Sequence, residues 1–266
     1  MQTRLGLNNS AKERMAAGQA ALGFTARLSR SADIARIAKA TGHDFLFIDG
    51  QHSIFDLETI AHMANAALAI GIAPLVRVRG VDDPDVPVLL DNCVAGIIYP
   101  DVNTVAEARR AVERAKFPPI GKRSVVGAYP QFDYRSVPLK EGIPQLNDSC
   151  LVVCMIEAPE GLKNVEAIAE VEGIDVLHLG GNDYLAAIGK PGQFDDPALA
   201  AAQERVLKAA RQGGKFAGCA GIRGIDQQIQ VIRQGFQFLT TQTDIAFISS
   251  AATQWVQAIR KATPEK

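Results

Sequence analysis

Short apolar runs alternate with segments of helical period along the chain, and this alternation predicts parallel strands joined by helices. The run Phe45–Asp49 is short and mostly apolar, which is typical of a strand buried on both faces of a parallel sheet. From Asp56 to about Ile70 the apolar positions follow a helical spacing, and Gly71 can end that helix. Similar runs predict seven further strands, at residues 20–25, 74–78, 95–100, 151–156, 174–179, 215–219 and 236–241.

A helix is predicted after each strand. Eight strand–helix units in 266 residues are typical of a (β/α)8 TIM barrel. A doubly wound sheet is the alternative, but it usually has fewer strands at this length, and no G-x-G-x-x-G motif follows the first strand. No linker or change of composition divides the chain, so one domain is expected over residues 1–266. The predicted helices span residues 9–17 before the first strand, then 32–40, 56–70, 83–92, 105–116, 162–170, 198–212, 226–233 and 245–262.

Residues 117–151 interrupt this alternation. The segment is rich in proline and glycine and carries Arg123, Tyr129 and Phe132. A structureless segment of this length inside a compact domain is usually a functional loop. We therefore expect either a functional loop or an excursion of the chain over the active-site face.

The composition excludes several classes of function. Apolar residues make up 47% and charged residues 21% of the sequence, as in a globular protein with a sizeable core. The net charge is −1 and the basic residues are scattered, so no nucleic-acid partner is expected. No apolar stretch reaches the roughly 18 residues of a transmembrane helix, and no signal-peptide core is present, so no membrane partner is expected. The four cysteines lack zinc-site spacing, and a cytoplasmic location is expected.

Two acidic residues stand where neighbouring strands end. Glu157 follows the predicted fifth strand and Asp183 the sixth, and the carboxyl ends of the strands carry the active site in this fold. Carboxylate oxygens from two strand ends suit Mg²⁺ or Mn²⁺, with water and substrate completing the coordination. Two solvated loop carboxylates are the alternative.

A histidine and an arginine mark the ends of the second and third strands. His52 is a candidate for proton transfer, because histidine ordinarily titrates near neutral pH, and a simple turn histidine is the alternative. Arg77 lies in an apolar strand, so it needs a carboxylate partner, either from the protein as a structural salt bridge or from a substrate. His178 lies between apolar neighbours and is interpreted as a hydrogen-bonded core residue. No lysine stands at a strand end, so a Schiff-base mechanism is not indicated.

Several short motifs occur in order on the predicted elements. Through them the chain resembles, over nearly its whole length, the HpcH/HpaI family of metal-dependent (class II) pyruvate aldolases. Each motif is short, and their order along the chain makes the resemblance specific. The motifs are Ile48-Asp-Gly-Gln-His52, Leu75-Val-Arg77, Leu90-Asp91, Gly96-Ile-Ile-Tyr-Pro100, Phe117-Pro-Pro-Ile-Gly-Lys-Arg123, Ile156-Glu157, Lys163-Asn164, Val171-Glu-Gly-Ile-Asp175 and Gly180-Gly-Asn-Asp183-Tyr-Leu185.

The resemblance implies a role for each candidate. Glu157 and Asp183 match the ligands of a divalent metal, Mg²⁺ or Mn²⁺, with Co²⁺ as a further candidate. His52 matches the general base, supported through water by Asp91. Arg77 matches the residue that binds the keto oxygen and stabilises the enolate. These roles are physically coherent, because a cation and a guanidinium both offset negative charge that develops on the enolate oxygen.

The resemblance also implies how the substrate is held. The backbone of Gly181 and Asn182 is expected to take the pyruvate carboxylate, and Gly180, Gln51 and Met155 are expected to contact the substrate. Some of these positions depart from the family pattern, in which Gln51 is commonly Glu and Met155 is Gln. The other departures are Gly181 in place of Pro, and Cys93 and Ser124 in place of Gly.

The expected activity is reversible cleavage of a 4-hydroxy-2-oxo acid to pyruvate and an aldehyde. One alternative is a malyl- or citramalyl-CoA type of lyase, although no basic cluster marks a groove for the coenzyme. Another is a divergent barrel that binds a keto acid without turning it over. The apolar final helix, with Phe247 and Trp255, suits the barrel floor or a neighbouring subunit, and the resemblance favours a homohexamer built from trimers or dimers.

Overall fold

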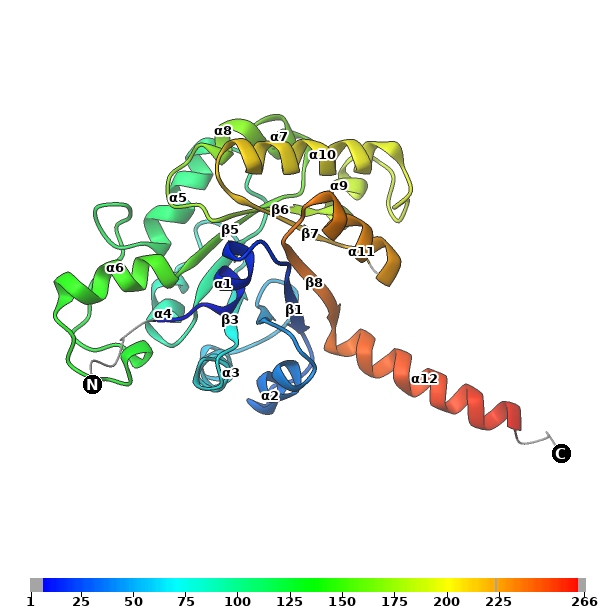
Figure 1. The fold of residues 1–266 in the computed structure, drawn as a ribbon, viewed down its shortest axis with the longest axis horizontal. Coiled ribbons are helices and arrows are strands. Elements are labelled where there is room, and N and C mark those ends of the chain that lie inside the picture. The colour runs from blue at the N-terminus through cyan, green and yellow to red at the C-terminus, as the bar shows by residue number, and fades with distance from the viewer. Residues whose placement is uncertain (1–6, 223, 263–266) are drawn as a thin grey trace.

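The computed structural model of the chain describes residues 7–222 and 224–262, and within them eight parallel strands close into a barrel in chain order. Helices surround the barrel (Figure 1), so the predicted (β/α)8 architecture is confirmed. The strands are β1 (Ala21–Ala26), β2 (Phe45–Asp49), β3 (Ala73–Arg77), β4 (Gly96–Tyr99), β5 (Leu151–Ile156), β6 (Val176–Gly180), β7 (Phe216–Ala220) and β8 (Phe238–Thr243).

The helices agree with the predicted ones in order and approximate length, with two additions, α6 and α9. The helix predicted over residues 162–170 is divided into α7 and α8. The helices are α1 (Ser10–Ala16), α2 (Asp33–Ala40), α3 (Leu57–Ala69), α4 (Val86–Asp91), α5 (Val105–Ala115), α6 (Leu139–Ser149), α7 (Pro159–Lys163), α8 (Val165–Ala169), α9 (Gly181–Ala187), α10 (Pro197–Gln212), α11 (Ile225–Gln234) and α12 (Asp244–Ala262).

Apolar side chains fill the interior of the barrel. Phe45, Leu75, Val153 and Phe238 have no exposed surface, and the Phe45 and Phe238 rings stack at 4.5 Å. Burying one such side chain stabilises the fold by about 1.5–3 kcal/mol. Alternate residues of a strand face the same side, so Asp49, four residues after Phe45, enters the interior at the carboxyl end of β2. The strand pattern thus places apolar side chains in the barrel interior and polar side chains at the carboxyl ends of the strands.

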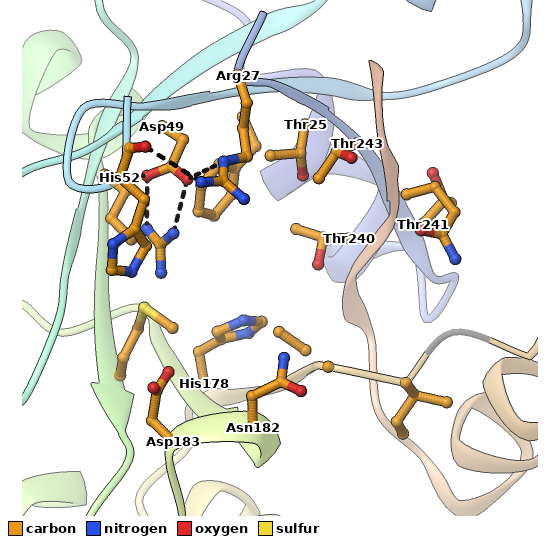
Figure 2. Close-up of a pocket in the computed structure, with 17 residues that line it drawn as sticks. Thr25, Arg27, Asp49, His52, His178, Asn182, Asp183, Thr240, Thr241 and Thr243 are labelled. Carbon is orange, nitrogen blue, oxygen red and sulfur yellow. Dashed lines mark hydrogen bonds and ion pairs between the residues drawn. The ribbon is translucent and has the colours of Figure 1, made fainter. Parts of the chain in front are cut away.

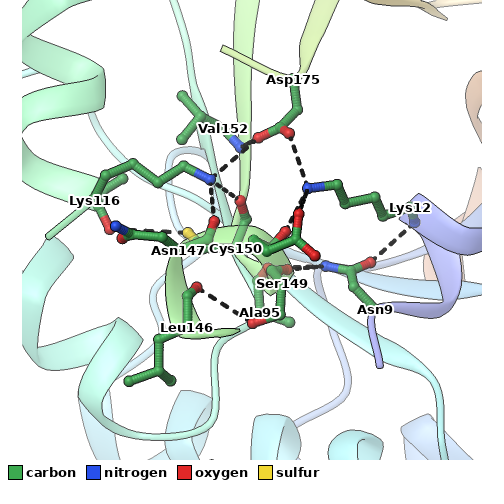
Figure 3. A network of polar contacts seen from close by, with 12 residues as sticks. Asn9, Lys12, Ala95, Lys116, Leu146, Asn147, Ser149, Cys150, Val152 and Asp175 are labelled. Carbon is green, nitrogen blue, oxygen red and sulfur yellow. Dashed lines mark hydrogen bonds and ion pairs between the residues drawn. The ribbon is translucent and has the colours of Figure 1, made fainter. Parts of the chain in front are cut away.

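A polar network closes the amino end of the barrel (Figure 3). The Asn9 side chain donates a hydrogen bond to the carbonyl of Ala95 at 3.0 Å, which ties the start of α1 to the segment before β4. The buried Lys116 ammonium donates to the Asn147 carbonyl at 2.6 Å and lies 3.5 Å from an Asp175 carboxylate oxygen. A buried ammonium is tolerated only with such partners. This end of the barrel is therefore a structural floor.

The prediction that residues 117–151 form a structureless functional loop or an excursion over the active-site face is wrong. Residues 117–151 contain α6 and a short 3-10 helix at Pro130–Phe132, and they form a small core of their own from Phe117, Tyr129, Phe132 and Leu146. Asn147, in α6, belongs to the floor network, so the segment packs at the end of the barrel away from the strand carboxyl ends. Gly142 and Pro144 lie inside α6 and obscured its helical pattern.

The last helix, α12, projects away from the barrel (Figure 1). Its only buried residue is Asp244, at its first position, while Trp255 is 71%, Ile248 59% and Ile259 57% exposed. In one chain the helix therefore does not cover the barrel floor, which was one of its two predicted positions. None of the helices in the described residues is long and apolar enough to cross a membrane.

Candidate active site

A cavity of about 300 Å³ opens at the carboxyl ends of the strands (Figure 2), where this fold places its active sites. Ligand sites commonly measure roughly 300–1,000 Å³, so this cavity suits a small molecule. The predicted residues that line it are His52, Arg77, Met155, Asn182 and Asp183. The rest of its wall includes threonines and small residues from β1, β7 and β8.

Arg77 is held by a buried carboxylate of the protein. Its guanidinium donates from Nε to Asp49 Oδ1 at 3.0 Å and from Nη2 to Asp49 Oδ2 at 2.8 Å, in register between the ends of β2 and β3. Arg27 adds a second ion pair, with its Nε 3.2 Å from the same Oδ2. Asp49 has no exposed surface, so one buried negative charge lies between two guanidinium groups. The partner predicted for Arg77 is thus a protein carboxylate.

The same carboxylate orders the turn that carries His52. Asp49 Oδ1 accepts hydrogen bonds from the backbone N–H groups of Gln51 at 3.3 Å and His52 at 3.2 Å. Burial alone would raise the pKa of Asp49, but the hydrogen bonds and charge of Arg77 outweigh it and hold this pKa below its ordinary value. Asp49 therefore stays ionised and fixes both Arg77 and the His52 backbone.

His52 reaches the cavity from the loop after β2 (Figure 2). Its carbonyl accepts a hydrogen bond from Arg27 Nη2 at 3.1 Å, while its exposed imidazole has no hydrogen-bond partner among the described residues. A histidine ring held by its backbone and open at both nitrogens can exchange a proton with a bound molecule.

Glu157 follows the last residue of β5 and is not among the residues that line the cavity. Its side chain is buried, and Oε1 accepts one hydrogen bond, from the backbone N–H of Asp101 at 3.0 Å. Burial raises the pKa of this carboxyl well above its ordinary value, and the nearby charges of Asp183 and Asp101 raise it further. Gly180 makes room for it, because a Cβ at that position would stand 2.3 Å from Glu157 Oε2. A buried carboxylate with one hydrogen-bond partner among the described residues is a candidate ligand for a cation.

Asp183 supplies the second carboxylate, from the first turn of α9, and lines the cavity beside Asn182 (Figure 2). Its negative charge contributes to the raised pKa of Glu157. Such an oxygen donor set fits Mg²⁺ or Mn²⁺. The part of the chain that the structure describes contains no cluster of three His, Cys, Asp or Glu side chains able to bind a metal, so water and substrate oxygens would complete the coordination.

His178 is not the hydrogen-bonded core residue that the sequence suggested. It has no exposed surface, yet it lines the cavity, and neither ring nitrogen has a hydrogen-bond partner within the described residues. Gly218 leaves space for the ring, since a Cβ there would lie 2.3 Å from Nδ1. Burial, together with the charge of Arg77, lowers the pKa of His178 to about 3. The ring is therefore neutral at ordinary pH.

Asp91 and Gln51 lie away from the cavity. Asp91 ends α4, on the side where the chain enters the amino end of β4, and it forms an ion pair with the buried Arg123. A single chain does not bring it to His52. Gln51 follows β2, but its side chain does not line the cavity, and its buried Oε1 has no partner among the described residues. Gly180 and Gly181 are likewise absent from the cavity wall, although the neighbouring Asn182 belongs to it.

Four residues of the site were missed by sequence reasoning. Asp49 was taken as the end of an apolar strand, although a carboxylate facing a barrel interior signals a charged partner. Arg27 and Thr25, at the end of β1, and Thr240, on β8, carried no motif. The alternation of Phe238 with Thr240 could have indicated that Thr240 faces the interior.

Comparison with known proteins places these observations in a family. The sequence matches the family model described as HpcH/HpaI aldolase/citrate lyase over residues 27–251. The 4-hydroxy-4-methyl-2-oxoglutarate aldolase of Chaetomium globosum is 34% identical, over 95% of this chain and 96% of that protein. The 2-keto-3-deoxy-L-rhamnonate aldolase of Escherichia coli is 29% identical, over 93% of this chain and 92% of that protein.

A solved structure shares the whole fold. The HpcH/HpaI aldolase of Desulfitobacterium hafniense superposes with a TM-score of 0.90 at 28% identity, covering 95% of this chain and 97% of that one. The expected resemblance is thereby confirmed by a model match over most of the sequence, by two aldolases of similar length and by a common barrel. The chain belongs to the HpcH/HpaI aldolase/citrate lyase family.

Proposed function

We propose that this family member, a carbon–carbon lyase of the aldolase type, cleaves a 4-hydroxy-2-oxo acid reversibly to pyruvate and an aldehyde with the help of a divalent metal. The observation that carries the proposal is one cavity lined by His52, Arg77 and Asp183, with the buried Glu157 following β5 and subject to the charges of Asp183 and Arg77. By their names, the two aldolase relatives act on 4-hydroxy-2-oxo acids. These acids differ in the second half of the molecule, from C4 onward. The reaction assigned to this chain is the one that the two names share, the aldol cleavage of a 4-hydroxy-2-oxo acid.

Glu157 and Asp183 are the residues that would hold Mg²⁺ or Mn²⁺. A bound divalent ion supplies Lewis-acid polarisation of the keto group. The chain's own part is to keep a buried carboxylate in place, which the Asp101 N–H and the space beside Gly180 achieve.

Arg77 is positioned to offset negative charge on the keto oxygen. Asp49 binds its Nε and Nη2, which fixes the plane of the guanidinium and leaves Nη1 for a ligand in the cavity. A preorganised donor aimed at developing charge lowers a barrier without reorganisation at the moment of reaction. Its stacking over the Phe47 ring, with Cζ 5.4 Å from the ring centroid, restricts the group further.

His52 is proposed as the proton carrier. In cleavage it takes the proton of the C4 hydroxyl, the C4 oxygen becomes the aldehyde carbonyl, and the C3–C4 bond breaks. The electron pair of that bond moves to the keto oxygen and gives the enolate of pyruvate. Protonation of C3 then completes pyruvate. The ring of His52 is exposed and its backbone is held by hydrogen bonds. This suits a group that takes a proton from the C4 hydroxyl and gives one to C3.

The substrate carboxylate is assigned to the backbone at Gly181 and Asn182. These residues begin α9, and the first N–H groups of a helix have no partner within it. Asn182 and Asp183 bring this turn to the cavity wall, next to the proposed cation. The carboxylate and the keto oxygen of a 2-oxo acid would then face the same side of the cavity.

We propose that α12 packs against a second copy of the chain. Ile248, Trp255 and Ile259 lie on one face of that helix and are more than half exposed. An apolar helix face left in water favours association, and a homo-oligomer would bury it.

The chemical half of the proposal is tested by proton exchange. Wild-type protein with Mn²⁺ should exchange the methyl protons of pyruvate in deuterated water, followed by NMR, because the same enolate forms without an aldehyde. Lack of exchange would favour a barrel that binds keto acids without turnover. Calorimetric binding of a CoA thioester would instead favour the malyl-CoA type of lyase.

A further inference from the structure

His178 is a buried polar side chain with nothing to bind in the protein. It lies on β6 between Met155 and Gly218 in register, has no exposed surface, and both ring nitrogens lack partners within the described residues. Buried polar groups are usually satisfied, because an unpaired one costs about 1–3 kcal/mol. Since the ring also lines the cavity (Figure 2), the missing partner belongs to the cavity's contents.

Two threonines extend this polar surface. Thr25 on β1 and Thr240 on β8 line the same cavity, and neither hydroxyl has a hydrogen-bond partner among the described residues. The neighbouring Thr241 differs, because its hydroxyl donates to the Gly23 carbonyl at 3.0 Å. Figure 2 shows His178 and Thr240 facing the same open space. The cavity thus has a wall of unpaired hydrogen-bonding groups on β6, β8 and β1.

Within this wall, Thr240 on β8 lies across the closed barrel from the strands that carry the proposed machinery for the keto acid, and Thr25 on β1 and His178 on β6 lie to either side of it. Arg77, Glu157 and His52 come from β3, β5 and the loop after β2. The side formed by β7, β8 and β1 therefore remains for the second half of the substrate, and Ala220 and Gly221 leave room there.

We propose that His178, Thr25 and Thr240 form a subsite that hydrogen-bonds a carboxylate on the second half of the substrate. The inference rests on the proposed aldolase function and names its substrate class, a 4-hydroxy-2-oxo dicarboxylate. His178 presents a neutral N–H donor, and the two hydroxyls add donors without a net charge.

Arg27 selects a carboxylate over a hydroxyl. Its guanidinium reaches into the cavity between Asp49 and Thr25 (Figure 2), and Asp49 already accepts two hydrogen bonds from Arg77. One buried carboxylate thus faces two guanidinium groups, which leaves a positive charge on this side of the cavity. A second carboxylate of the substrate would balance it.

Non-cleavable ligands test the subsite without turnover. 2-Oxoglutarate has the keto acid and a distal carboxylate but no C4 hydroxyl, 2-oxopentanoate replaces that carboxylate with a methyl group, and 5-hydroxy-2-oxopentanoate replaces it with a hydroxymethyl group. Dissociation constants are measured by calorimetry on the wild-type protein with saturating Mg²⁺. Wild type should bind 2-oxoglutarate at least about 10-fold more tightly than either analogue, the effect of hydrogen bonds to a charged group.

Two variants test which residues cause the preference for 2-oxoglutarate. His178→Phe should bring the ratio of 2-oxoglutarate to 2-oxopentanoate affinity close to one by weakening 2-oxoglutarate binding alone. Thr240→Val, which replaces only the hydroxyl with a methyl group, should lower the ratio about threefold. His62→Phe, the same change on the exposed face of α3, is the matched control and should leave the ratio unchanged.

The outcomes separate the two proposals. If pyruvate exchanges its protons but wild type shows no preference for 2-oxoglutarate, or if His178→Phe keeps the preference, the subsite is overturned while the aldolase stands. Equal binding of 5-hydroxy-2-oxopentanoate overturns the carboxylate assignment. If none of the three 2-oxo acids binds, the proposed function fails and the subsite fails with it.

Discussion

Asp49 binds the Arg77 guanidinium through both carboxylate oxygens, at 3.0 and 2.8 Å, across the carboxyl ends of β2 and β3. Because Asp49 is buried and binds two nitrogens of Arg77, it fixes the guanidinium in one plane while leaving one nitrogen for a ligand. The same carboxylate accepts the backbone N–H of His52. One residue without a catalytic role of its own thus positions the two groups proposed to carry the reaction.

Asp49→Asn should lower kcat/KM for pyruvate release by about 10- to 100-fold. The amide cannot pair with the Arg77 charge, and a hydrogen bond to a charged group contributes about 1.5–3 kcal/mol. Circular dichroism would show whether the fold is retained. Asp33→Asn, at an exposed surface ion pair, is the matched control with little expected effect. Unchanged kinetics in Asp49→Asn would remove the positioning role.

His178→Gln should flatten the dependence of stability on pH. The folded-state pKa of His178, about 3, lies below the unfolded value of about 6.5, so between these values the unfolded chain binds the extra proton. Wild-type stability is unaffected by this group above about pH 6.5 and falls as pH decreases, by up to about 1.4 kcal/mol per pH unit. Urea unfolding of metal-free protein between pH 5 and 7.5 measures the slope.

The His178→Gln variant should lack the fall in stability that His178 causes as pH decreases. His62→Gln, on the exposed face of α3, should keep it. Equal slopes in wild type and His178→Gln would mean that His178 gains a proton in the folded state as readily as in the unfolded one.

Gly180→Ala should weaken metal binding and activity by at least about 10-fold. The new Cβ would stand 2.3 Å from Glu157 Oε2, so the carboxylate must move. Displacing a binding group by a fraction of an ångström lowers both affinity and activity. The measurement is the rise in melting temperature on adding Mn²⁺. Gly127→Ala, where a Cβ meets nothing within 4 Å, is the control. A full metal response in Gly180→Ala would contradict the placement of the cation at Glu157.

Trp255→Glu should shift the protein to a smaller assembly. Trp255 is 71% exposed on the apolar face of α12, and a charge there would have to be buried in the proposed contact between copies. Light scattering after gel filtration gives the mass. Gln257→Glu changes the opposite face of the helix and should leave the mass unchanged. A monomeric wild type would reject the contact itself.

The strands and most helices could be predicted because their periodicity is local. The ends of β2, β3, β5 and β6 followed from short apolar runs. Those ends place His52, Arg77 and Asp183 around one cavity and the buried Glu157 at the end of β5. The exception, α6, has Pro144 inside it and is held by packing of its Leu146 in a small core, which no local pattern reveals.

The partners of the site residues could not be predicted, because they depend on contacts between strands. Asp49 and Arg77 are 28 residues apart and meet only through the strand register. His178 looked like a core residue since its neighbours are apolar, and only the closed barrel places it at a cavity. Asp91, expected near His52, lies with Arg123 instead, because α4 ends on the side of the barrel floor.

The central claim is tested most directly by pyruvate release from 4-hydroxy-2-oxoglutarate, followed with a coupled assay before and after EDTA. Activity should disappear with EDTA, return with Mn²⁺ or Mg²⁺, and be lost in Glu157→Ala. Turnover that persists without metal, or full activity in Glu157→Ala, would contradict a metal-dependent aldolase built on Glu157 and Asp183.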